Sequence, residues 1–218
     1  MALDEAAVAG AVGSVDGSAT GQRRAAFIDR DGVVNRLVPD PMTRRSESPL
    51  SIDAVELVPG AARAIARLRR LGWIVVCVTN QPAAAKKRIS VADVMEVHGR
   101  VAALLAEEGT AWDGSRVCLH HPEGVVPELA LECQCRKPKP GMLIEAAHEY
   151  DVDLSSSWMI GDTDADVGAG RAVGVRTVLV TNPASGHKRS GVMTADLVVR
   201  DLEHAVSALE SRQKASTL

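Results

Sequence analysis

The sequence predicts an α/β domain built on a doubly wound parallel sheet. Short apolar runs rich in Val and Ile alternate along the chain with longer segments of helical periodicity, which is typical of parallel strands covered by helices on both faces. Aromatic residues make up only 2% of the 218 residues, so we expect a core of Val, Leu, Ile and Ala. This length suits one well-buried domain and is too short for two ordinary ones.

Each predicted element follows from local signals in the sequence. We expect strands at 25–28, 73–78, 117–118, 158–160 and 177–180, and helices at 59–71, 91–108, 140–150, 165–173 and 201–211. Pro59 lies in the first turn of the first helix and Gly72 ends that helix. Ser90 and Asp93 have the spacing of a capping box at the start of the second helix. The stretch 36–52, rich in Pro, Ser and Arg, is expected to be a loop.

The two ends of the chain differ in character from the middle. Residues 1–22 have low complexity and are expected to be a disordered tail, residues 23–211 to form the domain, and residues 212–218 to be frayed. The first segment lacks the basic-then-apolar order of a signal peptide, and no apolar run approaches the ~20 residues of a membrane span. A formal net charge of −3 gives no reason to expect nucleic-acid binding. We therefore expect a cytoplasmic monomer that binds neither membranes nor nucleic acid.

Four polar segments stand out, and three of them directly follow predicted strands. They are Asp29-Arg30-Asp31-Gly32, Thr79-Asn80-Gln81, Arg136-Lys137-Pro138 and Gly161-Asp162-Thr163-Asp164-Ala165-Asp166. In parallel sheets ligands bind beyond the carboxyl ends of the strands, where these segments should meet. Asp29 and Asp31 can divide the work of phosphate-ester hydrolysis, because one carboxylate can attack phosphorus while the other protonates the leaving oxygen and later activates water.

Such chemistry needs a cation and groups that hold the phosphate oxygens. Asp162 would complete an oxygen-rich Mg²⁺ site, since attack by a carboxylate on a phosphate ester brings anions together. Thr79 and Lys137 would bind the remaining oxygens and neutralise charge in the transition state. A calcium loop over the last segment is excluded, because Val167 and Val173 stand where such a loop needs Gly and Glu.

Three of the four cysteines lie with a histidine in a segment rich in Pro and Gly, the loop 118–135. The predicted ligands of a closed tetrahedral Zn²⁺ site are Cys118, His120, Cys133 and Cys135. Such a loop offers no core for thiols, so a structural zinc ion explains the cluster better than packing does, and it would support the backbone that presents Lys137. His121 is a rival ligand that spacing alone does not exclude. Cys77 lies in an apolar run and is expected to be an inert core residue.

The four polar segments together resemble the signature motifs of the haloacid-dehalogenase-like (HAD) phosphatases over about residues 24–180. The resemblance implies a HAD-like Rossmannoid fold, an aspartyl-phosphate intermediate on Asp29, and Asp31 as general acid and base. It also implies Mg²⁺ bound by the Asp29 carboxylate, the Asp31 backbone carbonyl and Asp162, with Asp166 in support and paired to Lys137. No long insertion separates the first two motifs, so we expect no separate cap domain and a site roofed by loops.

The zinc loop followed by Arg-Lys-Pro-Lys-Pro-Gly at 136–141 resembles a narrower group. It is similar to the D-glycero-D-manno-heptose 1,7-bisphosphate 7-phosphatases and to their relatives, the histidinol-phosphate phosphatases. This implies that Arg136 recognises the substrate and that Asn80 and Gln81 line its pocket. The leading hypothesis is removal of the 7-phosphate of a heptose bisphosphate, with histidinol phosphate or another small phosphomonoester as the alternative substrate. A non-catalytic zinc knuckle is the alternative of another class, and the loop's lack of interleaved aromatic residues speaks against it.

Two stretches depart from this resemblance. The run Pro-Ala-Ala-Ala-Lys-Lys-Arg at 82–88 stands where the group has small, Gly-containing residues, and the loop 36–52 is longer than expected. The basic run suits either a second phosphate on the substrate or, as the favoured interpretation, a solvated helix start. Lys188 and Arg189 are expected in a surface loop, with contact to the substrate as the alternative.

Overall fold

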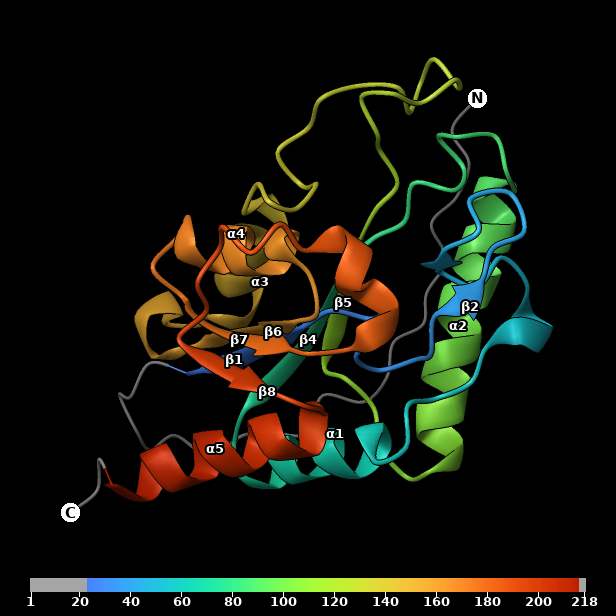
Figure 1. The fold of residues 1–218 in the computed structure, drawn as a ribbon. Helices are drawn as coiled ribbons and strands as arrows, with labels where there is room; N and C mark the ends of the chain where they lie inside the picture. Colours follow the sequence, from blue (N-terminus) through green and yellow to red (C-terminus); the bar gives the residue numbers. More distant parts are fainter. Residues whose placement is uncertain (1–22, 216–218) are drawn as a thin grey trace, which may run out of the picture.

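The computed structural model describes residues 23–215, so the predicted tail 1–22 and residues 216–218 lie outside the described residues. A six-stranded parallel sheet forms the centre of the molecule (Figure 1). Its strands, in spatial order, are β5 (Gly114–Cys118), β4 (Ile74–Asn80), β1 (Ala25–Ile28), β6 (Trp158–Gly161), β7 (Arg176–Val180) and β8 (Leu197–Val199). The predicted α/β class with a doubly wound parallel sheet is thus confirmed.

Helices cover both faces of this sheet, as Figure 1 shows. On one face lie α1 (Ala61–Arg70), α2 (Val91–Glu107) and α5 (Leu202–Ala215), whose apolar residues join those of the strands in the larger core cluster. On the other face lie α3 (Gly141–Tyr150) and α4 (Asp164–Arg171) around a smaller cluster. No helix among residues 23–215 is both long enough and apolar enough to cross a membrane.

Side chains of β1 point alternately into the two core clusters, one on each face of the sheet. Ala26 and Ile28 pack in the cluster under α1 and α5, while Ala25 and Phe27 pack in the cluster under α3. All four side chains are buried, because a central parallel strand has protein on both faces. The first polar residue of the segment, Asp29, follows at the carboxyl end of the strand.

Several predicted elements differ from the observed ones. The loop 36–52 contains a short antiparallel hairpin of β2 (Val38–Pro39) and β3 (Ser46–Glu47), and is followed by the short helix η1 (Ile52–Ala54). Strand β8 was not predicted, because three residues at the edge of a sheet are too few to give a periodic signal. Helix α5 runs to Ala215, so the prediction that the frayed end begins at 212 was wrong for 212–215. Two further short helices, η2 (Leu154–Ser156) and η3 (Pro183–Lys188), complete the described chain.

The run 82–88 is a turn rather than a helix start, with its alanines buried and with Lys86 and Lys87 exposed as the solvated interpretation expected. Ala83, Ala84 and Ala85 are at most 8% exposed. Val125 in the loop 118–135 donates its backbone N–H to the Ala85 carbonyl oxygen at 2.7 Å. The Cys/His loop therefore packs directly on this turn. Gly124 permits this approach, because a Cβ there would lie 3.0 Å from the Ala85 carbonyl oxygen.

Candidate active site

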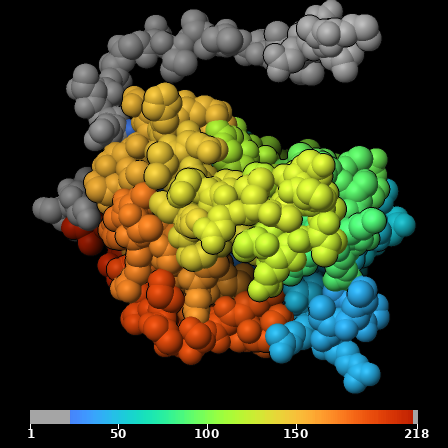
Figure 2. All heavy atoms as spheres, turned by 90° about the horizontal axis from the view of Figure 1, so that it is seen from above, coloured from blue at the N-terminus to red at the C-terminus, as the bar shows by residue number. Residues whose placement is uncertain are grey.

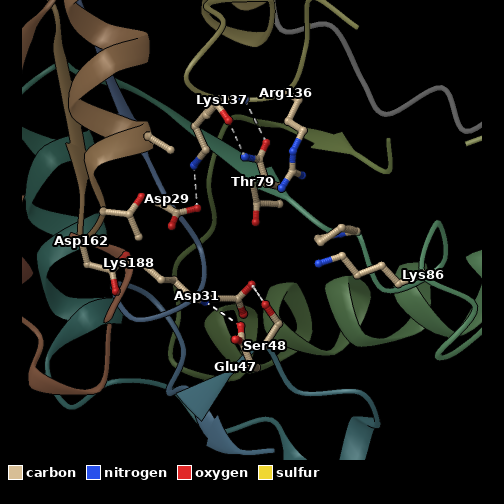
Figure 3. A pocket seen from close by; sticks show the side chains of 14 residues that line it. Asp29, Asp31, Glu47, Ser48, Thr79, Lys86, Arg136, Lys137, Asp162 and Lys188 are labelled. Carbon is tan, nitrogen blue, oxygen red and sulfur yellow. Dashed lines mark hydrogen bonds and ion pairs between the residues drawn. The ribbon is translucent and has the colours of Figure 1, made fainter. Parts of the chain in front are cut away.

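The carboxyl ends of the central strands surround a cavity of about 320 Å³ (Figure 3). Three of the four predicted polar segments line it at or directly after the carboxyl ends of β1, β4 and β6, and the Arg136-Lys137 pair reaches it from the end of the Cys/His loop. Figure 2 looks onto one face, where the loop in yellow, the segment around η3 in orange-red and the β2–β3 hairpin in blue surround a hollow. The site is covered by loops alone, since the chain has no element between β1 and β4 large enough to form a separate cap domain.

Asp29 forms an ion pair with Lys137, the lysine of the site. Its Oδ1 accepts a hydrogen bond from Lys137 Nζ at 2.8 Å, and the residue is 8% exposed. Burial raises the pKa of Asp29 to about 6, although the neighbouring ammonium of Lys137 opposes this shift. Asp29 is therefore mostly an anion at neutral pH, with one oxygen held and the other available.

Lys137 is fixed by contacts on its side chain and on its backbone. Its Nζ also lies 2.6 Å from Asp166 Oδ1 and donates to the Val78 carbonyl oxygen at 2.7 Å. Burial alone would lower the pKa of Lys137, but the two carboxylates raise it above its usual value, so the ammonium stays charged. The side-chain amide of Asn80 pairs with the Lys137 backbone in both directions, at 3.0 and 3.1 Å. The amide thus ties the lysine to the end of β4.

Asp31 is surrounded by donors. Its carboxylate accepts hydrogen bonds from Arg30 at 3.1 Å, from Asn35 at 2.9 Å, from Ser48 at 2.9 Å and from the Gln81 amide. Burial would raise the pKa of Asp31, but the Arg30 guanidinium and these hydrogen bonds hold it below its usual range. The resting site therefore keeps Asp31 as a carboxylate.

Asp162 has the opposite environment. It is 1% exposed, and neither of its carboxylate oxygens has a hydrogen-bond partner among the described residues. Burial and the charges of Asp29 and Asp166 raise the pKa of Asp162 to about 8. Gly32 permits this approach, because its φ is +88° and a Cβ there would lie 2.1 Å from Asp162 Oδ2. Buried carboxylate oxygens without a partner are costly unless a cation binds them.

The three buried carboxylates fit a divalent cation. Asp29, Asp162 and Asp166 each place one oxygen within 4.8 Å of the others. Oxygen ligands of this kind suit Mg²⁺. Because Lys137 already neutralises Asp166, the unpaired oxygens of Asp162 and the free oxygen of Asp29 are the ones that lack a counter-charge.

We expect Asp162→Asn to stabilise the protein when no metal is bound. The Asp162 carboxyl ionises near 3.8 when unfolded and near 8 when folded, so unfolding releases its proton and stability falls as the pH rises across this window. The variant should raise the melting temperature in chelator at pH 8 by a few degrees, or about 1–2 kcal/mol. Mg²⁺ should raise the melting temperature of the wild type and leave that of the variant unchanged. A variant that melts below the wild type in chelator would contradict this electrostatic account.

The four Cys/His side chains of the loop converge. The ligand atoms of Cys118, His120, Cys133 and Cys135 lie within 4.8 Å of one another. The three sulfur atoms are 3.0 to 3.6 Å apart, and His120 Nδ1 lies 3.4 Å from Cys135 Sγ. Tetrahedral zinc with bonds of about 2.3 Å separates thiolates by roughly 3.8 Å, so the cluster has the size of such a site. The ring of His121 instead accepts the backbone N–H of Glu123, outside the cluster.

The structure differs from the sequence predictions in which residues of the polar segments face the cavity. Asn80 and Arg136 line the cavity, whereas Gln81 is 3% exposed and bonds Asp31 and Thr79 rather than facing the open space. Four polar or charged residues from outside the predicted polar segments also line the cavity. They are Glu47 and Ser48 at the end of the hairpin, Lys86 from the turn 82–88 and Lys188 from η3.

The sequence pointed to two of these additional residues, Lys86 and Lys188, with contact to the substrate as one of two interpretations for each. The run 82–88 contains Lys86, for which a role at a second phosphate was one of two interpretations. Ser48 and Lys188 lie in polar stretches without periodicity, and only the folded chain brings them to the cavity. Lys188 Nζ lies 2.8 Å from Glu47 Oε2, so η3 and the hairpin meet across the cavity.

Buried carboxylates beside a fixed lysine at the carboxyl end of a parallel sheet suit the hydrolysis of phosphate esters. Comparison with known proteins also indicates a phosphatase. The HAD-hydrolase-like family model matches residues 134–205. The chain is 32% identical over 190 residues to the D-glycero-beta-D-manno-heptose-1,7-bisphosphate 7-phosphatase of Yersinia pestis, which covers 87% of this chain and 97% of the relative. It is 35% identical over 159 residues to the D-glycero-alpha-D-manno-heptose-1,7-bisphosphate 7-phosphatase of Burkholderia mallei, over 73% of this chain and 80% of the relative.

A solved structure gives the same result. The D,D-heptose 1,7-bisphosphate phosphatase from B. bronchiseptica, in complex with magnesium and phosphate, matches with a TM-score of 0.68 and 31% identity, over 87% of this chain and 99% of that chain. The chain therefore belongs to the HAD-like phosphatases, in the family of the heptose-1,7-bisphosphate 7-phosphatases. The family resemblance drawn from the sequence is confirmed, and the protein is a phosphatase that acts on a small phosphorylated substrate.

Proposed function

We propose that this phosphatase is Mg²⁺-dependent and removes the 7-phosphate of D-glycero-D-manno-heptose 1,7-bisphosphate. One observation carries the choice of a bisphosphate. The cavity has two groups of cationic side chains, Lys137 beside Asp29 and a second group of Lys86, Arg136 and Lys188 around its outer part. The first group serves the phosphate that is cleaved, and the second suits a phosphate that stays on the sugar.

The first chemical step transfers the phosphoryl group to Asp29. The free oxygen of Asp29 attacks phosphorus, and the bond from phosphorus to the sugar oxygen breaks. Asp31 in its protonated form gives its proton to that oxygen. Lys137 and the Thr79 hydroxyl hold the phosphoryl oxygens and offset the growing negative charge. Since the resting contacts of Asp31 favour its carboxylate, substrate binding must weaken some of them before this step.

The second step frees the enzyme. The Asp31 carboxylate takes a proton from a water molecule, whose oxygen attacks the phosphorus on Asp29. The bond from phosphorus to the Asp29 oxygen breaks, which releases inorganic phosphate and restores the Asp29 carboxylate. Asp31 then carries the proton and loses it to solvent when its resting contacts form again.

Metal ions complete the proposed site. The Asp29 carboxylate, the Asp31 backbone carbonyl and Asp162 would hold Mg²⁺, which reduces the repulsion between the anionic enzyme groups and the phosphate. Cys118, His120, Cys133 and Cys135 would hold a structural Zn²⁺. The Arg136 backbone N–H donates to Cys133 Sγ at 3.3 Å, so the zinc cluster would fix the start of the segment that carries Lys137.

Side-by-side turnover of two substrates tests the proposal. Histidinol phosphate carries an ammonium group and one phosphate, so the second cationic group of the cavity should repel it, whereas a heptose bisphosphate is attracted. We expect kcat/KM to be at least about tenfold higher for the bisphosphate, with the alpha and beta anomers assayed separately. The advantage should shrink in Lys86→Gln, with Lys87→Gln as a neighbouring control. Preferred hydrolysis of histidinol phosphate would contradict the substrate and leave the phosphatase class intact.

Ser48 is expected to position Asp31. Loss of its hydroxyl in Ser48→Ala removes one donor from the Asp31 carboxylate, so the pKa of Asp31 should rise. The basic limb of the pH–kcat profile should then move upward by about half a unit, because the general acid remains protonated to higher pH. Ser51→Ala is a matched control, since Ser51 lies three positions along and is exposed. An unshifted profile in Ser48→Ala would show that this hydrogen bond has no part in proton transfer.

A further inference from the structure

The segment 182–189, which includes η3, contacts both loops that carry the proposed Mg²⁺ ligands. It bonds to the loop that follows β1 and to the two-residue link between β6 and α4. Asp29 belongs to the first of these loops, and Asp162 belongs to the second. The hydrogen bonds of this segment therefore bear on how the two carboxylates are held relative to each other.

Arg189 holds the backbone at Asp162 through its guanidinium group. Its Nη1 donates to the Asp162 carbonyl oxygen and to Ser185 Oγ, both at 3.0 Å. Its Nη2 donates to the Asn182 carbonyl oxygen at 2.9 Å. The buried Ser185 hydroxyl lies 3.3 Å from the same Asp162 oxygen and can also donate to it. Because a guanidinium is planar and rigid, one side chain fixes the distance between the two carbonyl oxygens that it bridges.

Asn182 extends this connection to the loop after β1. Its side-chain Nδ2 donates to the Gly32 carbonyl oxygen at 2.9 Å. Gly32 directly follows Asp31, whose backbone carbonyl is one of the proposed Mg²⁺ ligands. A chain of hydrogen bonds thus runs through Arg189 and Asn182 and joins the two loops that would hold the metal ion.

The Asp162 carboxylate depends on its backbone for its position. Neither of its carboxylate oxygens has a hydrogen-bond partner among residues 23–215, so no such bond orients the group before a cation binds. The carbonyl oxygen of the same residue is the atom that Ser185 and Arg189 hold. Mg²⁺ demands a nearly ideal octahedral arrangement of short bonds, so a small displacement of one ligand costs affinity.

We propose that Arg189 is a positioning residue for Mg²⁺, which fixes the Asp162 ligand through its backbone carbonyl. This role rests on the proposed Mg²⁺ dependence and is independent of which phosphate ester is the substrate. Charge and positioning predict opposite effects when the guanidinium is removed. A nearby positive charge repels a cation, so its loss alone would tighten Mg²⁺ binding. Loss of the positioning bonds weakens Mg²⁺ binding, by about tenfold for a residue that orients a metal ligand.

Calorimetric titration of the full-length protein with Mg²⁺ measures this effect without substrate. Dialysis without a chelator removes Mg²⁺ and leaves a metal ion in the Cys/His loop in place. Arg189→Gln should raise the dissociation constant for Mg²⁺ by about tenfold. Arg189→Lys keeps the charge but cannot bridge two carbonyl oxygens, so it should weaken binding by a similar factor. A role in stability alone would lower the melting temperature and leave the dissociation constant of the folded variants unchanged.

Two further variants complete the test. Ser185→Ala removes a single hydroxyl, should fold normally, and should weaken Mg²⁺ binding by about two- to threefold. Arg200→Gln removes an exposed arginine that pairs with Asp201, and should leave Mg²⁺ binding unchanged. Unchanged or tighter binding in the folded Arg189 variants, or in Ser185→Ala where those variants do not fold, would overturn the proposal. Absence of Mg²⁺ binding in the wild type would instead overturn the proposed metal site itself, and this role with it.

Discussion

Replacement of Asp29 by Asn is expected to lower kcat by about 10⁴-fold or more while the protein remains folded. Asn keeps the shape of the side chain but lacks the anionic oxygen that attacks phosphorus. The fold should tolerate the change, because Asp29 is one of three buried carboxylates whose charges oppose one another. The measurement is phosphate release under saturating substrate and Mg²⁺, together with the melting temperature.

A control variant and a trapping experiment accompany this prediction. Asp53→Asn removes an exposed carboxylate in η1 and should leave kcat unchanged. Acid quenching of the wild type during turnover should trap a phosphoryl group on the peptide that contains Asp29. Activity of Asp29→Asn within about tenfold of the wild type, or a trapped phosphoryl group on another residue, would remove Asp29 from its assigned role.

Replacement of Cys133 by Ser is expected to abolish zinc binding and to destabilise the protein by about 3 kcal/mol or more. The loop 118–135 contains no α-helix, and one backbone hydrogen bond, from His121 N–H to the Leu129 carbonyl oxygen, joins its two halves, so the four ligands would be the main link between its ends. Activity should also fall by about tenfold, because the Arg136 backbone would lose its sulfur acceptor and Lys137 its support. Metal content of the purified protein and its melting temperature are the measurements.

His121→Ala is the matched control for this prediction. His121 adjoins His120 but lies outside the cluster, so the variant should keep one zinc ion per chain and a nearly wild-type melting temperature. A strong chelator should lower the melting temperature of the wild type and leave that of Cys133→Ser unchanged. Equal zinc content in wild type and Cys133→Ser would contradict a site of four ligands.

The parts of the fold with strong local signals were predictable from the sequence. The capping box of Ser90 and Asp93 is present at the start of α2, because it depends only on residues three positions apart. The central strands were found because burial on both faces demands continuous apolar runs. The hairpin β2–β3 and strand β8 have two or three residues each, and their pairing depends on distant parts of the chain.

The residues of the candidate site that lie at strand ends were predictable from the sequence, and those from the hairpin were not. Asp29, Asp31, Thr79 and Asp162 directly follow or end strands, so the topology alone brings them together. The donors that surround Asp31 come from the hairpin and from the end of β4, and no spacing rule relates Ser48 to Asp31.

Asp166 has a consequence for how this chain can change over time. One of its oxygens pairs with Lys137, and the other accepts the backbone N–H and the hydroxyl of Thr163 in the capping box that begins α4. Selection for a well-formed helix and selection for a charged lysine therefore act on one side chain. A descendant that had lost all turnover would still be under pressure to keep Asp166. Its presence in a distant homologue consequently says little about whether that homologue is an active enzyme, whereas the presence of Asp29 says much more.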